Sequence, residues 1–140
     1  MSTAARRYYE RGMGALGRNE PDQAIDALAS AIDLAPHFID ARLAYAVALC
    51  RLGDMPRAAQ TLRAGLGRAR TAPARAALCM TLGEVLTTAG DFPAAEDAFA
   101  QAESHPATAA RAAAGRARVL AKTGHYGDAV AALLRAARAS

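Results

Sequence analysis

Two ten-residue stretches decide how this chain folds: Gly53–Leu62 reads GDMPRAAQTL, and Gly90–Phe99 reads GDFPAAEDAF. Each begins with a glycine, which can adopt the left-handed conformation that closes a helix. The aspartate that follows can accept backbone hydrogen bonds from the first turn of the next helix. The proline after it lies in that first turn, where a missing N–H costs nothing. Each stretch therefore predicts a turn between two antiparallel helices and the start of the second helix.

The same pattern occurs four times along the chain. A Gly or Asn is followed by an alanine, then by a large apolar residue, and finally by a small residue, always at the same spacing. The step between corresponding alanines is 34, 37 and 34 residues. The spacing gives each second helix one packed face, so the chain is predicted to be a stack of helical hairpins. The four copies are Asn19, Ala24, Leu28 and Ala31; Gly53, Ala58, Leu62 and Gly65; Gly90, Ala95, Phe99 and Ala102; and Gly124, Ala129, Leu133 and Ala136.

Composition favours an all-α fold. Alanine, the strongest helix former, fills 40 of the 140 positions, whereas aromatic residues make up 5%. The net charge of +4 is too small by itself to indicate binding to nucleic acid. The N-terminal residues lack the apolar core of a secretory signal, and no apolar run has the length of a membrane span. We therefore expect a cytoplasmic protein.

These repeats resemble the tetratricopeptide repeat (TPR), a helix–turn–helix of 34 residues. A bulky and a small residue early in the first helix, as in Leu82-Gly83, and an aromatic residue just after the turn, as at Phe92, fit this family. The resemblance implies a right-handed α-solenoid of four hairpins, or about eight helices, in a single domain over residues 1–140. The implied repeats are residues 5–38, 39–72, 76–109 and 110–140.

The sequence departs from the family pattern in two ways. Arg11 and Arg116 occupy a position that is usually apolar. Three extra residues near 73–75 lengthen one step of the repeat, and we expect them to extend the turn between hairpins because Pro73 breaks a helix.

No arrangement of residues predicts catalysis, a metal site or a cofactor. His37, His105 and His125 fall in separate predicted turns, and no Gly-rich loop follows a strand. Cys50 and Cys79 have no CxxC spacing, and we expect both to be small apolar residues. We therefore predict that the protein is not an enzyme.

The resemblance implies that the first helices of the repeats line a concave binding groove. Its N-terminal part is apolar and adaptable, whereas the fourth repeat contributes cations. The expected partner is a peptide or helix of another protein with apolar and acidic parts. The alternative is that these side chains only pack between repeats or are solvated. The expected groove residues are Arg6, Tyr9, Met13, Leu16, Leu43, Val47, Cys50, Met80, Glu84, Thr87, Arg111, Arg118 and Lys122.

The last helix carries Val130 and Leu134 on or near one side, although the final element of a solenoid usually has a polar outer face. Either this apolar edge is tolerated, or it forms an interface with a partner, a second copy of the chain or a further segment. Self-association through this helix is therefore one expectation.

The sequence thus predicts a protein–protein interaction module: an adaptor, an assembly scaffold or a small chaperone. TPR domains that clamp a C-terminal carboxylate use Lys, Asn and Arg at positions that hold Tyr9, Met13, Ala44, Ala77 and Thr81 here, so that clamp is not expected. The alternative function is nucleic-acid binding through arginine-rich surfaces. The aromatic stacking platforms of RNA readers are missing, which favours the first function.

Overall fold

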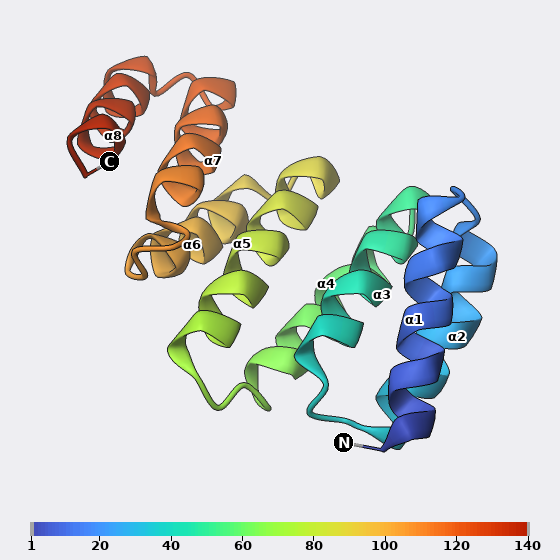
Figure 1. Cartoon of the computed structure of the whole chain (residues 1–140). Helices are drawn as coiled ribbons and strands as arrows, with labels where there is room; N and C mark the ends of the chain where they lie inside the picture. The colour runs from blue at the N-terminus through green and yellow to red at the C-terminus, as the bar shows by residue number, and fades with distance from the viewer. Residues whose placement is uncertain (1, 140) are drawn as a thin grey trace. The chain divides into compact units, whose positions relative to one another are not determined.

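The structure is a computed structural model that describes residues 2–139. Over this range the chain forms eight α-helices and no strand, which confirms the predicted all-α fold class (Figure 1). Consecutive helices pair into four hairpins. The helices are α1 (Thr3–Gly17), α2 (Pro21–Leu34), α3 (Ile39–Arg51), α4 (Met55–Leu66), α5 (Ala72–Ala89), α6 (Phe92–Glu103), α7 (Ala109–Lys122) and α8 (Tyr126–Ala139).

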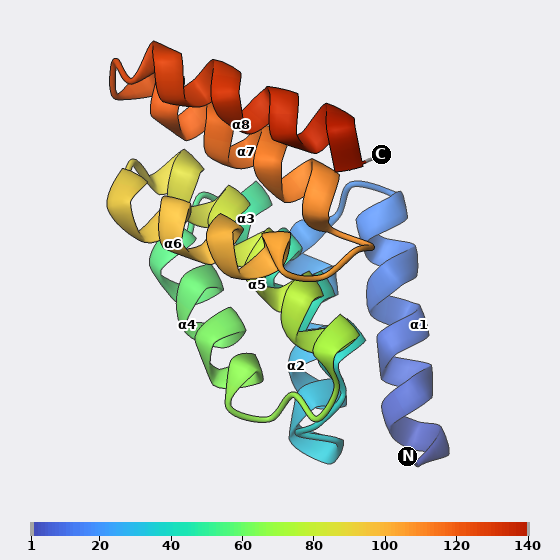
Figure 2. The ribbon, with the colours of Figure 1, turned by 90° about the vertical axis from the view of Figure 1, so that its left-hand side faces the viewer.

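The chain divides into two compact units, Met1–Ala69 and Arg70–Ser140, each built from two hairpins. In the first unit, α3 packs against both α1 and α2. In the second, α7 packs against α5, α6 and α8 (Figure 2). Within each unit the two hairpins therefore stack as neighbouring repeats do. That residues 1–140 act as a single domain stays a prediction.

The turns inside the hairpins have the conformation that the repeated pattern predicts. Asn19, Gly53, Gly90 and Gly124 all adopt positive φ values, between 57° and 86°. The carboxylate of Asp54 accepts a hydrogen bond from the N–H of Arg57 at 3.3 Å, and that of Asp91 accepts one from the N–H of Ala94 at 3.4 Å. Local chemistry therefore ends one helix and starts the next, as expected.

The expectation that residues 73–75 extend a loop is wrong. They belong to the first turn of α5, which has 18 residues, whereas α3 has 13 and α7 has 14. Thr71 is the N-cap of α5, and its hydroxyl accepts a hydrogen bond from the N–H of Ala74 at 3.3 Å. Pro73 lies where a helix tolerates proline, so it starts this helix rather than interrupting one.

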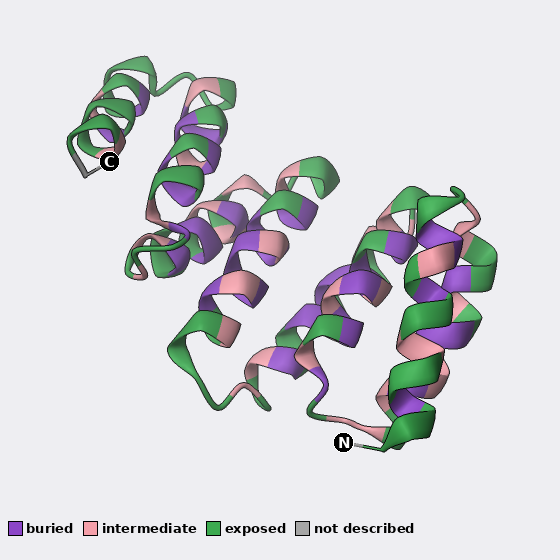
Figure 3. Ribbon diagram, in the orientation of Figure 1, coloured by how far each residue is buried: buried purple, intermediate pink, exposed green. Residues whose placement is uncertain are grey.

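The core of each unit is built where a large residue of a second helix meets a glycine of a first helix. Figure 3 shows that the helices of both units carry buried residues. Leu28 and Phe99 are almost completely buried. A Cβ added to Gly12 would lie 2.5 Å from Cγ of Leu28, and one added to Gly83 would lie 2.6 Å from the ring of Phe99. These glycines let the paired helices approach closely enough for the large side chain to fill the space between them.

Candidate functional site

A cleft of about 460 Å³ lies between α1 and α3 in the first unit. It includes five residues of the predicted groove, namely Tyr9, Met13, Leu16, Leu43 and Val47. Met13 and Val47 are exposed large apolar residues, with 42% and 37% of their surface accessible. The cleft is also lined by Gly17, Asp40, Ala44 and Arg51.

Helix periodicity brings these residues to one surface. Met13 lies one turn after Tyr9 on α1, and Val47 lies one turn after Leu43 on α3, so each pair shares a helix face. The ring of Tyr9 packs against that of Phe38 with 4.8 Å between the ring centroids. One wall of the cleft is therefore held in place by an aromatic contact at the start of α3.

Arg51 fixes the other end of the cleft. Its Nη1 donates a hydrogen bond of 2.8 Å to the carbonyl oxygen of Leu16, in the last turn of α1. Carbonyl groups at a helix C-terminus have no partner inside the helix and carry partial negative charge, so a guanidinium satisfies them well. The bond ties α1 to the C-terminal end of α3.

Charged groups stand at both ends of the apolar surface. Asp40 and Arg51 line the cleft at opposite ends of α3, about 16 Å apart along a helix that rises 1.5 Å per residue. Burial raises the pKa of the Tyr9 phenol, Asp40 raises it further, and Arg6 opposes the shift. Tyr9 therefore keeps its O–H donor at neutral pH.

The remaining groove residues of the first unit lie outside this cleft lining. Arg6 on α1 is exposed, and Cys50 on α3 is half-buried. Neither Cys50 nor Cys79 forms a disulfide.

In the second unit the predicted groove residues have diverse surroundings. Met80 is buried, with 5% of its surface exposed, and the hydroxyl of Thr87 donates to the carbonyl oxygen of Gly83 at 2.7 Å. Arg111 and Glu84 form an exposed ion pair of 3.8 Å. Arg118 and Lys122 are exposed on α7, one turn apart. Glu84 and Arg111, both expected groove residues, thus contact each other.

Two sequence models of the tetratricopeptide repeat match the chain, one over residues 15–82 and the other over residues 80–140. Together they cover residues 15–140, and the four helical hairpins have the architecture of this repeat. The chain belongs to the tetratricopeptide repeat family. Among curated proteins, none matches its sequence.

Solved structures of TPR proteins share the fold of this one. MamA from Desulfovibrio magneticus RS-1 is 14% identical, with a TM-score of 0.81 over 96% of this chain and 75% of its own. PilF from Pseudomonas aeruginosa is 21% identical, with a TM-score of 0.81 over 98% of this chain and 61% of its own. A TPR protein from Parabacteroides merdae is 12% identical, with a TM-score of 0.77 over 94% of this chain and 51% of its own. At these identities the likeness establishes the fold alone.

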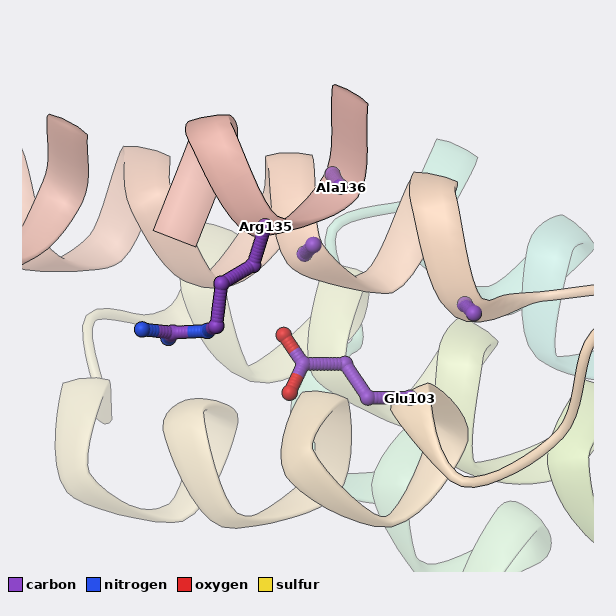
Figure 4. Close-up of a pocket in the computed structure, with 5 residues that line it drawn as sticks. Glu103, Arg135 and Ala136 are labelled. Carbon is purple, nitrogen blue, oxygen red and sulfur yellow. The ribbon is translucent and has the colours of Figure 1, made fainter. Parts of the chain in front are cut away.

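A smaller cleft of about 160 Å³ lies in the second unit of this TPR protein (Figure 4). Glu103 from α6 and Arg135 from α8 extend into it, and Ala109 and Ala113 of α7 form part of its lining. Sequence reasoning missed this cleft because the positions of Glu103 and Arg135 carry other residue types in the other TPR repeats. The carboxylate of Glu103 also bonds Nη1 of Arg116 at 3.0 Å.

Within residues 2–139, no helix of the TPR protein is both long and apolar enough to cross a membrane. The same residues bring together no set of three His, Cys, Asp or Glu side chains able to hold a metal ion. His37, His105 and His125 lie in connecting segments between helices, as predicted.

Proposed function

We propose that this chain is a non-enzymatic interaction module whose first unit holds a segment of a partner protein in the cleft between α1 and α3. TPR proteins generally act as interaction modules, and this chain belongs to that family. The observation that carries the proposal is the cleft itself, where the exposed side chains of Met13 and Val47 lie beside Leu43. Apolar side chains in a concave site are what a partner's apolar residues bind best.

The charges at the ends of the cleft indicate the chemistry of the partner segment. Arg51 uses one N–H on Leu16, and a guanidinium has further donors that suit a carboxylate. Asp40 at the opposite end suits a basic group. The segment we propose has apolar residues on one face, with an acidic residue toward Arg51. Arg118 and Lys122 are exposed on α7, and we propose that they bind acidic residues of a partner.

The role we propose is that of an adaptor, an assembly scaffold or a small chaperone. Each of these roles needs only reversible binding of a polypeptide segment, without any reacting group. A cytoplasmic location and the absence of a carboxylate clamp stay predictions from the sequence.

A peptide-display selection on the full chain tests the cleft. Peptides enriched on the wild-type protein are measured by calorimetry against Val47→Glu and against the matched control Leu34→Glu. Leu34 is also an exposed large apolar residue, but it ends α2 and does not line the cleft. Burying a glutamate against the apolar segment should weaken binding at least about tenfold for Val47→Glu and leave Leu34→Glu unchanged.

Equal affinity of the selected peptides for Val47→Glu and wild type would show that the cleft is not the binding site. The double variant Arg118→Glu with Lys122→Glu tests the second contribution separately. It should weaken the binding of acidic peptides more than that of neutral ones, and this loss of affinity should be smaller at high salt.

A further inference from the structure

The outer face of α8 is unlike that of any other helix in the second unit. Val130, Leu133 and Leu134 are about half exposed, and Tyr126 is 68% exposed. Figure 3 shows that most of α8 is exposed. These four residues, called here the α8 stripe, lie three or four residues apart and therefore share one side of the helix. They make up half of the eight exposed large apolar residues found in the part of the chain that the structure describes.

The equivalent face of α6 shows what such a surface contacts inside this chain. Aligning the repeats on Ala95 and Ala129 makes Phe99 the counterpart of Leu133. Phe99 is 1% exposed because α7 covers it, with Gly115 placed so closely that an added Cβ would lie 2.6 Å from the ring. The residue after Gly115 is Arg116, which pairs with Glu96 at 3.5 Å and Glu103 at 3.0 Å on α6.

The first unit repeats this arrangement with apolar residues. Leu28 on α2 is the counterpart of Phe99, and it clusters with Ala44 of α3. Tyr45, the residue after Ala44, packs against the same cluster, as does Ile25 of α2. The position of Glu103 is held by Ile32 on α2, which is half-buried.

The two interfaces follow one rule. In each, the covering helix carries a small residue opposite the large residue of the second helix. The next residue of the covering helix is chemically suited to the residues that flank this large residue on the second helix. Tyr45 packs with the apolar Ile25 against one cluster, and Arg116 pairs with the acidic Glu96 and Glu103. On α8 the flanking positions are held by Val130 and Ala137, both uncharged.

We propose that the α8 stripe binds an amphipathic helix of a partner protein, in which a small residue opposite Leu133 is followed by a large apolar residue. This surface is separate from the cleft between α1 and α3. The chemistry comes from the chain's own interfaces: apolar flanks such as Val130 and Ala137 take an apolar side chain and reject an arginine, whose charge would be left without a carboxylate.

The first helix of a second copy does not satisfy this rule. In α1 the counterparts of Ala44 and Tyr45 are Glu10 and Arg11. Glu10 is too large to lie opposite Leu133, and Arg11 would bring its charge to uncharged flanks. The Arg11 guanidinium instead lies 5.3 Å from the centre of the Tyr8 ring. Head-to-tail association through α1 and α8 is therefore disfavoured.

The test uses two synthetic peptides and the full chain. The first peptide is α3 itself, Ile39–Arg51 with Cys50→Ser, which contains Ala44-Tyr45. The second differs only by Tyr45→Arg. Each is titrated onto the isotope-labelled protein while backbone amide shifts are followed by NMR. The tyrosine peptide should shift amides of α8 and bind at least about fivefold more tightly than the arginine peptide.

Substitutions in α8 provide the control for specificity. The double variant Val130→Glu with Ala137→Glu gives α8 the carboxylates of α6, so the order of the two peptides should reverse. Leu133→Glu should abolish binding of both. The proposal is overturned if the two peptides bind alike to both proteins, or if the tyrosine peptide leaves the α8 amides unshifted at its solubility limit. It is also overturned if sedimentation of the chain alone reveals a dimer that Leu133→Glu dissociates, because the stripe would then belong to a second copy.

Discussion

The ring of Phe99 is held between two glycines of different hairpins: a Cβ added to Gly83 or to Gly115 would lie 2.6 Å from it. Gly83 belongs to α5, in the same hairpin as Phe99, and Gly115 belongs to α7 of the next hairpin. One side chain therefore packs three helices together. The stacking of the two hairpins in the second unit depends on space that only glycine leaves free.

Gly115→Ala should destabilise the second unit. The added methyl group forces the Phe99 ring to move, and overpacking of this kind costs about 1–3 kcal/mol, which exceeds the roughly 0.5–1 kcal/mol that alanine gains over glycine in a helix. Thermal unfolding followed by circular dichroism measures the change. Gly127→Ala is the matched control, because nothing lies within 4 Å of the added Cβ in the first turn of α8.

Adding Phe99→Leu to Gly115→Ala should recover part of the lost stability, because the smaller side chain leaves room for the methyl group. A Gly115→Ala protein as stable as wild type would contradict this packing.

Arg116→Met should lower stability and make it less sensitive to salt. Arg116 pairs with Glu96 and Glu103, and its side chain is 27% exposed. Removing it takes away the ion-pair partner of two partly buried carboxylates, at a cost of about 1 kcal/mol for a partly solvated network. Urea unfolding at low and high salt measures both effects. Replacing both glutamates by glutamine in the Arg116→Met background should restore most of the loss, and failure to do so would mean that the arginine stem, not its charge, matters.

Gly53→Ala should destabilise the turn between α3 and α4, whereas Asn19→Gly should change stability little. Gly53 has φ of 81°, where an alanine side chain costs about 1–2 kcal/mol. Asn19 has φ of 57°, a conformation that asparagine tolerates and glycine adopts freely. Denaturant unfolding of the two variants provides the comparison. Equal losses would show that the turns depend on side-chain contacts rather than on backbone conformation.

Tyr9→Phe should reduce the loss of stability at high pH. The folded state raises the pKa of Tyr9 above its ordinary value of 10.0, so folding favours the neutral phenol. This contribution is fully present below the unfolded pKa and is lost as pH rises through the folded pKa. The free energy of unfolding is measured at neutral pH and above pH 10.0, and it should fall less steeply with pH for Tyr9→Phe than for the wild type. Tyr126→Phe, at an exposed position on α8, controls for the loss of a phenol.

The parts of the fold that sequence reasoning predicts correctly are those set by neighbouring residues. A glycine with positive φ, an aspartate N-cap and a proline in the first turn act within about five residues, so Gly53, Asp54 and Pro56 specify their turn by themselves. The helix-breaking tendency of proline predicts a loop at Pro73, but Thr71 two positions earlier caps α5 and places Pro73 in its first turn. The same proline begins a helix once a cap precedes it.

The same distinction applies to the candidate site: residues placed by periodicity within one helix were predictable, and contacts between helices were not. Tyr9, Met13, Leu43 and Val47 meet in one cleft because helix periodicity places them on facing sides of α1 and α3. The partners of Arg116, and the pairing of Glu84 with Arg111, depend on how one helix is registered against the next. Sequence spacing within a helix does not contain that register, so these contacts required the structure.

Glu10 and Arg11 on α1 and the apolar stripe on α8 give these two helices opposite capacities to accept a further hairpin. A protein engineer who wishes to lengthen the chain should graft new hairpins onto α8, with an amphipathic first helix that carries an Ala-Tyr dipeptide opposite Leu133. Grafting onto the α1 side would first require both polar residues to be replaced. Extension by design is thus easier at α8 than at α1.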